Sequence, residues 1–267
     1  MRSLPRVMVI GGSDSGAGAG IQADIKTVAA FGGYATTVIT AVTAQNTLGV
    51  PGVFPVAATF IAQQIQLLLE DIGTDSIKTG MLVSGATIEA VADALTASRA
   101  PLVIDPVMVA KGGTNLLDPA AIGRLCELLL PRAALVTPNV PEAELLLGVT
   151  IEDLAGMRRA AQRLSRFGAG AVLIKGGHLG GSMVHDVLLA GDEECVFSAP
   201  RLESQATHGT GCTLASAIAA GLAAGRDLGD AVEEARRYVR AAMASGLALG
   251  RGHRPLDHSV PGPWGRV

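Results

Sequence analysis

The chain carries the stretch Ser204-Gln-Ala-Thr-His-Gly-Thr-Gly-Cys-Thr-Leu-Ala-Ser-Ala-Ile-Ala-Ala-Gly-Leu-Ala-Ala224, which predicts a glycine-bearing turn followed directly by a helix. Gly209 and Gly211 flank Thr210, and Cys212 comes next. The first N–H groups of a helix have no intrahelical acceptor and lie at the positive end of its dipole, so such a turn can bind an anion such as a phosphate. A tight turn before a packed, Ala-rich helix would give the same pattern, so the rest of the chain has to decide between the two interpretations.

The composition favours one α/β domain that spans residues 1–267. Hydrophobic residues make up 49% of the chain and aromatic residues only 3%, which suits helices packed closely on a parallel sheet. The formal net charge of -3 and the lack of a clustered basic face argue against a nucleic-acid-binding protein.

Three features of the sequence predict a cytoplasmic protein that does not cross a membrane. Cys126, Cys195 and Cys212 are widely spaced and odd in number, as expected for free thiols in a reducing compartment. The first residues lack the apolar segment and cleavage site of a signal peptide. Residues 27–69 and 204–225 contain no Asp, Glu, Lys or Arg, but polar residues, Gly and Pro interrupt them too often for a membrane span.

Strand and helix patterns alternate along the chain, which predicts a doubly wound, mostly parallel central sheet flanked by helices on both faces. The expected strands cover residues 6–10, 34–42, 76–78, 102–105, 134–137 and 171–174, with a hairpin at 184–198. The expected helices begin near residue 21 and cover 60–71, 86–95, 154–167 and 231–247, with others after 118 and up to 147.

Polar side chains follow the strands of this predicted sheet: Asp14, Gln45, Asp105, Asn139 and Lys175. Ligands of open α/β sheets bind at the carboxyl ends of the strands, so we expect these side chains to gather there with the turn before Cys212. Such a set supplies the cation, the oxygen ligands and the backbone donors that phosphoryl transfer needs. The chain has neither a Walker sequence nor a protein-kinase catalytic loop, and the glycines of residues 11–20 do not form a clean dinucleotide fingerprint.

Six segments in the same order carry a resemblance to a known family. They are Gly12-Ser-Asp-Ser-Gly-Ala-Gly-Ala-Gly-Ile-Gln-Ala-Asp24, Thr43-Ala-Gln-Asn-Thr47, Asp105-Pro-Val-Met-Val-Ala-Lys111, Thr137-Pro-Asn-Val-Pro-Glu142, Lys175-Gly-Gly-His178 and Thr207-His-Gly-Thr-Gly-Cys-Thr-Leu214. Together they resemble the hydroxymethylpyrimidine/phosphomethylpyrimidine kinases of thiamine synthesis, members of the ribokinase-like superfamily. The resemblance covers essentially the whole chain.

The resemblance implies ATP- and Mg²⁺-dependent phosphorylation of 4-amino-5-hydroxymethyl-2-methylpyrimidine, and then of its monophosphate to the diphosphate. Gln45 can pair with the ring nitrogen and the exocyclic amine of an aminopyrimidine, because its amide is both donor and acceptor. Gly12, Ala19, Val42 and Met81 would shape the pyrimidine pocket. A loop-capping amide is the alternative for Gln45, and core packing is the alternative for the apolar four.

The remaining site residues would serve the phosphates. Cys212 occupies the place of the Asp of related sugar kinases, and a thiol at a helix N-terminus is expected to ionise more readily and to accept the hydroxyl proton. The amides of Gly209, Thr210 and Gly211 would stabilise the moving phosphoryl group. Lys175 and Thr210 would bind ATP phosphates, while Asp105, Asn139 and Glu142 would surround Mg²⁺. The alternatives are a buried structural thiol for Cys212, a first-turn acid that favours the helix dipole for Glu142 and a strand-end lysine with its charge in solvent for Lys175.

Two other functions and one assembly remain open. A pyridoxal or pyridoxine kinase would use the same turn, although Gln45 and Met81 favour the pyrimidine. A catalytically silent metabolite-binding regulator would not need the metal and phosphate residues. Relatives are usually dimers, and residues 27–69 offer an uncharged region for such an interface. We also expect a lid near Lys111. His208 is expected to take no part in proton transfer.

Overall fold

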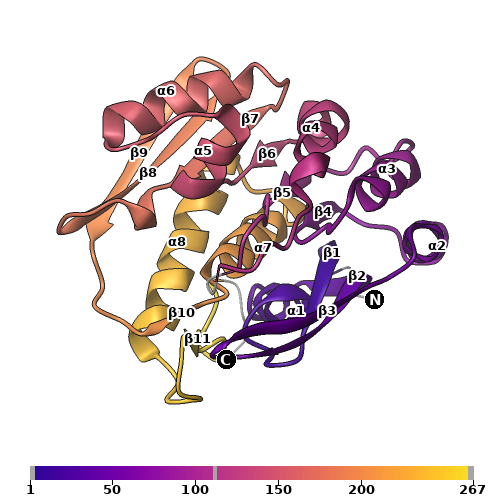
Figure 1. Cartoon of the computed structure of the whole chain (residues 1–267), viewed down its shortest axis with the longest axis horizontal. Coiled ribbons are helices and arrows are strands. Elements are labelled where there is room, and N and C mark those ends of the chain that lie inside the picture. Colours follow the sequence, from indigo (N-terminus) through magenta and orange to yellow (C-terminus); the bar gives the residue numbers. More distant parts are fainter. Residues whose placement is uncertain (1–3, 111–112, 264–267) are drawn as a thin grey trace.

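The computed structural model describes residues 4–110 and 113–263, and a nine-stranded sheet runs through it (Figure 1). The strand order is β3-β2-β1-β4-β5-β6-β7-β8-β9. From β2 to β7 neighbouring strands are parallel, and β3, β8 and β9 add antiparallel edges. The strands are β1 (Arg6–Asp14), β2 (Tyr34–Asn46), β3 (Gly49–Pro55), β4 (Ser76–Thr79), β5 (Leu102–Ile104), β6 (Leu135–Val136), β7 (Ala171–Lys175), β8 (Met183–Ala190) and β9 (Glu193–Pro200).

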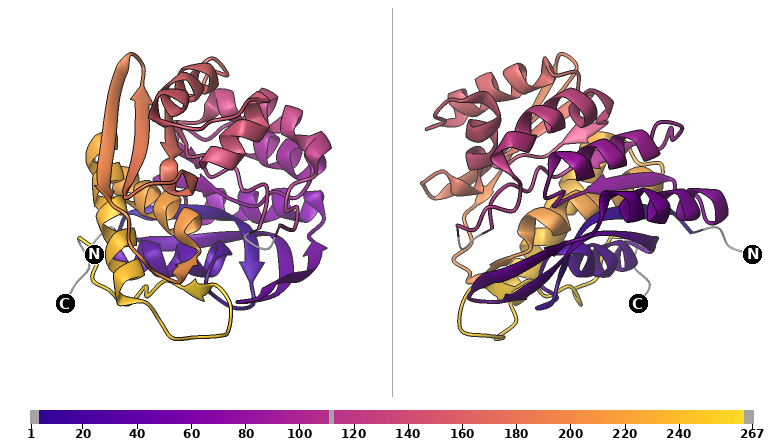
Figure 2. Two further views of the ribbon diagram at one scale, coloured as in Figure 1. Left: turned by 60° about the vertical axis from the view of Figure 1, so that its left-hand side comes forward. Right: turned by 45° about the vertical axis from the view of Figure 1, so that its right-hand side comes forward.

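Helices cover both faces of the sheet, as the alternating pattern predicts (Figure 2). One face carries α2 (Ala58–Asp71), α3 (Gly85–Ala94), α4 (Ile122–Arg124), α5 (Val140–Leu147) and α6 (Leu154–Ser165). The other face carries α1 (Gly20–Ala30), α7 (Thr210–Ala223) and α8 (Leu228–Ser245). Helix α4 is the middle of a helical segment whose flanking turns are 3-10 helix (Pro119–Ala121), π-helix (Leu125–Leu129) and 3-10 helix (Leu130–Arg132).

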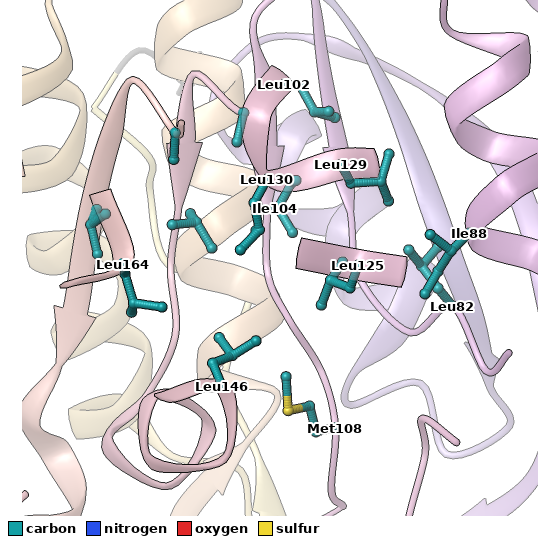
Figure 3. Packing of buried hydrophobic residues seen from close by; sticks show 14 of the residues in the cluster. Leu82, Ile88, Leu102, Ile104, Met108, Leu125, Leu129, Leu130, Leu146 and Leu164 are labelled. Carbon is teal, nitrogen blue, oxygen red and sulfur yellow. The ribbon is translucent and has the colours of Figure 1, made fainter. Parts of the chain in front are cut away.

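The core is divided by the alternation of side chains along the strands. Val7 and Val9 of β1 pack with α1, α7 and α8, whereas Met8 and Ile10 pack on the opposite face. Figure 3 shows part of this opposite cluster, in which Leu102 and Ile104 of β5 lie near Leu125, Leu129 and Leu130 of the helical segment. Both faces of the central strands are therefore buried, which explains their almost continuous hydrophobic sequences.

The region after β1 differs from the sequence prediction. Strand β2 does not end at Val42 but continues to Asn46, and it turns back into β3, which the sequence analysis missed. Two prolines and two glycines in Gly49–Pro55 are typical of a loop. An edge strand tolerates them, because one row of its backbone groups makes no ladder hydrogen bonds.

A short two-stranded sheet fixes the segment before α7. Strand β10 (Ala206–His208) pairs with β11 (Arg254–Pro255) near the end of the described chain. The side chain of Thr213, in the first turns of α7, lies 2.9 Å from Nε2 of His258. The segment near the end of the described chain therefore contacts α7's first turn on both flanks, at β10 before it and at Thr213 after it.

Among the described helices, none is both long and apolar enough to span a bilayer.

Candidate active site

A cavity of about 900 Å³ lies at the carboxyl ends of the parallel strands. A volume of this order is at the upper end of ligand sites, enough for two small ligands side by side. The predicted site residues that line it are Gly12, Ala19, Gln45, Met81, Asp105, Asn139, Glu142, Lys175, Gly209, Thr210, Gly211 and Cys212. Strand ends distant in sequence thus meet at one edge of the sheet, as predicted.

The turn before α7 leaves the helix N-terminus open to the cavity. Gly209 is the N-cap, so no side chain caps the first turn of the helix. Its φ of 86° lies in the left-handed region, and a Cβ there would collide with the carbonyl oxygen of Gly18, so only glycine fits. A Cβ on Gly211 would lie 3.3 Å from Asp105 Oδ2 and 3.4 Å from Lys175 Nζ. The open helix end therefore faces an ion pair across a very short gap.

That ion pair joins β7 to the end of β5. Lys175 Nζ donates to Asp105 Oδ1 over 2.7 Å, and Thr137 Oγ1 donates to the same oxygen over 3.2 Å. Burial alone would lower the pKa of Lys175, but the carboxylates of Asp105 and Glu142 raise it instead. The lysine therefore stays charged at the mouth of the open helix end, where it can meet a phosphate as a point charge.

Asn139 and Glu142 form a reciprocal capping box at the start of α5. Asn139 Oδ1 accepts the N–H of Glu142 at 2.9 Å, and Glu142 Oε2 accepts the N–H of Asn139 at 2.7 Å. Glu142 thus lies in the first turn of α5, as the alternative to metal binding predicts, and the reciprocal hydrogen bond to Asn139 was not foreseen. Burial, with the nearby charge of Asp105, raises the pKa of Glu142 to about 7.

The same residues fit a hydrated Mg²⁺. The capping box uses Oε2 of Glu142 and the lysine uses Oδ1 of Asp105, so the contacts among the described residues leave the other oxygen of each carboxylate for a further partner. Within the described ranges, no three His, Cys, Asp or Glu side chains are grouped to hold a metal ion. Mg²⁺ bound by one or two carboxylates, waters and nucleotide phosphates needs no such cage.

The thiol of Cys212 is less acidic than the sequence analysis predicts. Its sulfur accepts the N–H of Gly20, the first residue of α1, so two helix N-termini meet at this atom. Nevertheless burial raises the pKa of Cys212 to about 11, outweighing this hydrogen bond and the charge of Lys78. The expectation of easy ionisation was wrong, because desolvation exceeds the effect of the helix ends.

The pyrimidine-pocket residues come together with one exception. A Cβ on Gly12 would lie 2.9 Å from the sulfur of Met81, so the glycine makes room for that side chain. Gln45 lines the cavity beside Thr43. Val42 does not line the cavity. It is 47% exposed and pairs with Phe54 across the β2–β3 ladder. Successive side chains of a strand point to opposite faces, so the continuation of β2 turns Thr43 and Gln45 inward and Val42 outward.

A family model described as phosphomethylpyrimidine kinase matches residues 14–257. The chain belongs to this family.

The expected lid residue Lys111, with its neighbour Gly112, lies outside the described residues.

Relatives and solved structures agree with the family. The thiamine biosynthesis bifunctional protein ThiED of Geobacter sulfurreducens is 53% identical over 253 residues, which are 94% of this chain and 52% of that protein. The chain thus spans about half of that relative's length. The hydroxymethylpyrimidine/phosphomethylpyrimidine kinase of Streptomyces coelicolor is 47% identical over 95% of this chain and 94% of its own length. Pyridoxal kinase of Bacillus subtilis, solved as an ADP complex, is 35% identical with a TM-score of 0.89, covering 96% of this chain and 98% of that chain.

Asp14 and His208 are site residues whose connection the sequence did not reveal. Asp14 ends β1 and accepts the backbone N–H groups of Gly16, Gly18 and Ala19. Its Oδ2 lies 3.0 Å from Nε2 of His208, which directly precedes the turn of α7. An acid in a glycine-rich loop indicates such a local bond, but the partner almost two hundred residues away could be found only in the fold.

A buried ion pair forms the floor of the cavity and was also missed. Lys78 of β4 and Asp24 of α1 are 1% and 0% exposed, and Lys78 Nζ lies 3.0 and 2.9 Å from the two carboxylate oxygens. Ser216 of α7 donates to Asp24 Oδ1 over 2.7 Å. A lysine inside the hydrophobic strand pattern is a signal of a buried partner, since buried charges are almost always paired.

We expect Lys78→Met to lower the free energy of unfolding by about 3–5 kcal/mol, because it leaves the Asp24 carboxylate buried without its counter-charge. The double variant Lys78→Met/Asp24→Asn removes both charges and keeps the Ser216 hydrogen bond, so it should recover most of this loss. Urea unfolding of the three proteins measures the difference. A single variant as stable as the unsubstituted chain would contradict the role of the pair.

Proposed function

We propose that the chain transfers the γ-phosphoryl group of ATP to the hydroxymethyl group of 4-amino-5-hydroxymethyl-2-methylpyrimidine, and then phosphorylates the monophosphate to the diphosphate for thiamine synthesis. The observation that carries the proposal is the open N-terminus of α7, which faces the Asp105–Lys175 pair inside a cavity of about 900 Å³. Backbone donors and a cation aimed at one point are what a migrating phosphoryl group requires.

Each group of the site has a role in this transfer. The amides of Gly209, Thr210 and Gly211 stabilise charge on the phosphoryl group, and Lys175 binds the ATP phosphates. Asp105, after β5, and Glu142, in the first turn of α5, would hold a hydrated Mg²⁺. When bound, this ion would neutralise charge on the phosphates. The cavity continues to Val239 and Met243 of α8, whose apolar side chains offer a surface for the adenine ring.

The proton of the substrate hydroxyl goes to the sulfur of Cys212. Only the thiolate can accept it, and the raised pKa of the thiol means that a small fraction of the enzyme holds a thiolate at neutral pH. A loose transition state needs little proton removal before the phosphoryl group has moved, so this small fraction suffices.

Pyridoxal is the second candidate substrate, since a pyridoxal kinase shares the fold at 35% identity. The pyrimidine is preferred, because Gln45 and Met81 line the cavity and a pyrimidine kinase is 47% identical to the chain. A silent regulator is disfavoured, because a protein that only binds a pyrimidine has no use for the Asp105, Glu142 and Lys175 cluster.

We further propose a cytoplasmic homodimer built on the β2–β3 region. Phe54 is 75% exposed and its cross-strand partner Val42 is 47% exposed, while Leu48 between the two strands is also exposed. Large apolar side chains gathered on an edge strand are typical of an interface. The exposed free thiol of Cys195 suits a reducing compartment.

A substrate panel tests the proposed reaction. ADP release is measured with hydroxymethylpyrimidine, its monophosphate, pyridoxal and pyridoxine under identical Mg-ATP conditions. We expect the two pyrimidines to be turned over with kcat/KM at least about tenfold above the two pyridines, the range that one pair of unmatched hydrogen bonds provides. No ADP with any of the four would favour the regulator, and a preference for pyridoxal would favour the second candidate.

For Cys212→Ala we expect turnover to fall by about 100-fold or more, the usual contribution of a proton acceptor, with the dissociation constant of the pyrimidine changed by less than about threefold. Because the pKa of the Cys212 thiol is about 11, the thiolate fraction rises tenfold per pH unit below that value. The log(kcat/KM) of the unsubstituted enzyme should therefore rise with a slope near one from pH 7 to about pH 9, and the variant should lack this rise.

ADP release and calorimetric titration measure the two quantities. Cys195→Ala, which removes an exposed thiol outside the cavity, is the matched control. Equal turnover of Cys212→Ala and the unsubstituted enzyme would exclude the thiol as proton acceptor.

A further inference from the structure

We infer that His208, held by Asp14, fixes the orientation of the Gln45 amide and so determines which hydrogen-bonding edge of the substrate the site reads. The inference rests on the proposed function, because it concerns the same pyrimidine pocket. His208 acts as a positioning residue through Gln45.

The three side chains form a continuous chain of short contacts. His208 Nε2 lies 3.0 Å from Asp14 Oδ2 and 3.1 Å from Gln45 Nε2. The ring has little freedom, because it packs on the backbone of Gly18, where even a Cβ would be too close to Cδ2. Asp14 is 3% exposed and His208 16% exposed in their side chains, so water competes poorly for these contacts.

The protonation of Asp14 decides which ring nitrogen of His208 carries hydrogen. Burial alone would raise the pKa of Asp14, but the hydrogen bonds from His208 and from the amides of Ala19 and Gly16 hold it below its usual range. An ionised carboxylate has no proton to give. His208 must therefore donate from Nε2.

A protonated Nε2 cannot accept a hydrogen bond from the amide NH₂ of Gln45. The two ends of a side-chain amide exchange places by a half-turn with almost no change of shape, so the surrounding donors and acceptors decide the orientation. The carbonyl oxygen of Gln45 therefore faces His208, and its NH₂ group faces Thr43.

Thr43 leads independently to the same orientation. Its Oγ1 lies 2.9 Å from the carbonyl oxygen of Ser13, which can only accept, and 3.2 Å from the other end of the Gln45 amide. A hydroxyl has one hydrogen, and here Ser13 receives it. Thr43 can then only accept from Gln45, which requires the NH₂ group on that side.

This fixed orientation gives the site one acceptor and one donor in a set order. An aminopyrimidine carries a ring nitrogen directly beside the carbon that bears its exocyclic amine, so it pairs with both ends of the amide at once. Pyridoxal has no ring nitrogen next to the carbon that bears its hydroxyl group. One end of the amide would then stay unpaired, which costs affinity in a buried site.

The tautomer of His208 is the direct test, and it needs no catalysis. Long-range proton–nitrogen NMR of the histidine-labelled chain distinguishes protonated from unprotonated ring nitrogens, and the signal missing in His208→Gln assigns the residue. We expect hydrogen on Nε2. Hydrogen on Nδ1 alone would overturn the inference, because Gln45 would then donate to His208.

Matched variants test the consequence for the substrate. His208→Leu should raise the KM for the pyrimidine by about tenfold, leave the KM for ATP unchanged, and lower the preference for pyrimidine over pyridoxal by about tenfold. His208→Gln supplies two amide hydrogens, one for Asp14 and one for Gln45, and should restore both values to within about threefold.

Equal impairment of the leucine and glutamine variants, or an equal fall for both substrates, would mean that His208 only supports the turn. Calorimetric binding of the pyrimidine to the same variants gives the answer without turnover. Failure of the proposed reaction and failure of this inference are therefore separate results.

Discussion

The buried pair of Lys78 and Asp24 is the interaction on which the site depends. It links β4 to α1, and Ser216 extends the link to α7. Each charge is stable only because the other is present, so the three elements cannot separate without exposing an unpaired ion to the interior. The pair thereby fixes the positions of α1 and α7, the two helices whose N-termini meet at Cys212.

Above this floor the charges are arranged across the cavity. Asp105 and Glu142 lie on one side with Lys175 between them, and the open end of α7 lies opposite. A phosphate bound at the open end of α7 meets positive charge from the lysine and the helix, while the carboxylate oxygens suit a metal ion. The same burial that makes these interactions strong also raises the pKa of Cys212, so the site favours anion binding over thiol ionisation.

The sequence predicted those features that are local or periodic. The unbroken apolar run of Val7, Met8, Val9 and Ile10 indicates a strand buried on both faces, and the glycines around Thr210 indicate the turn. The position of polar residues after each strand predicts that they gather, since parallel strands end at one edge. Almost all of the predicted site residues accordingly line one cavity.

The predictions that failed concern contacts between residues distant in the chain and the burial of side chains, which the sequence alone does not contain. The prolines of β3 obscured an edge strand, and the unrecognised continuation of β2 placed Val42 on the wrong face. The pKa of Cys212 depends on how much protein surrounds the sulfur, and the partners of Lys78 and His208 are far away in the chain.

The most direct test of the account is Gly211→Ala, because a single methyl group there would enter the gap between the helix end and the Asp105–Lys175 pair. Alanine favours a helix over glycine, so the free energy of unfolding should stay the same or rise by up to about 1 kcal/mol. ADP release with the pyrimidine should nevertheless fall by about 100-fold or more, the loss expected when donors to a developing charge are blocked. Turnover within about threefold of the unsubstituted enzyme would show that the phosphoryl group does not pass through this gap.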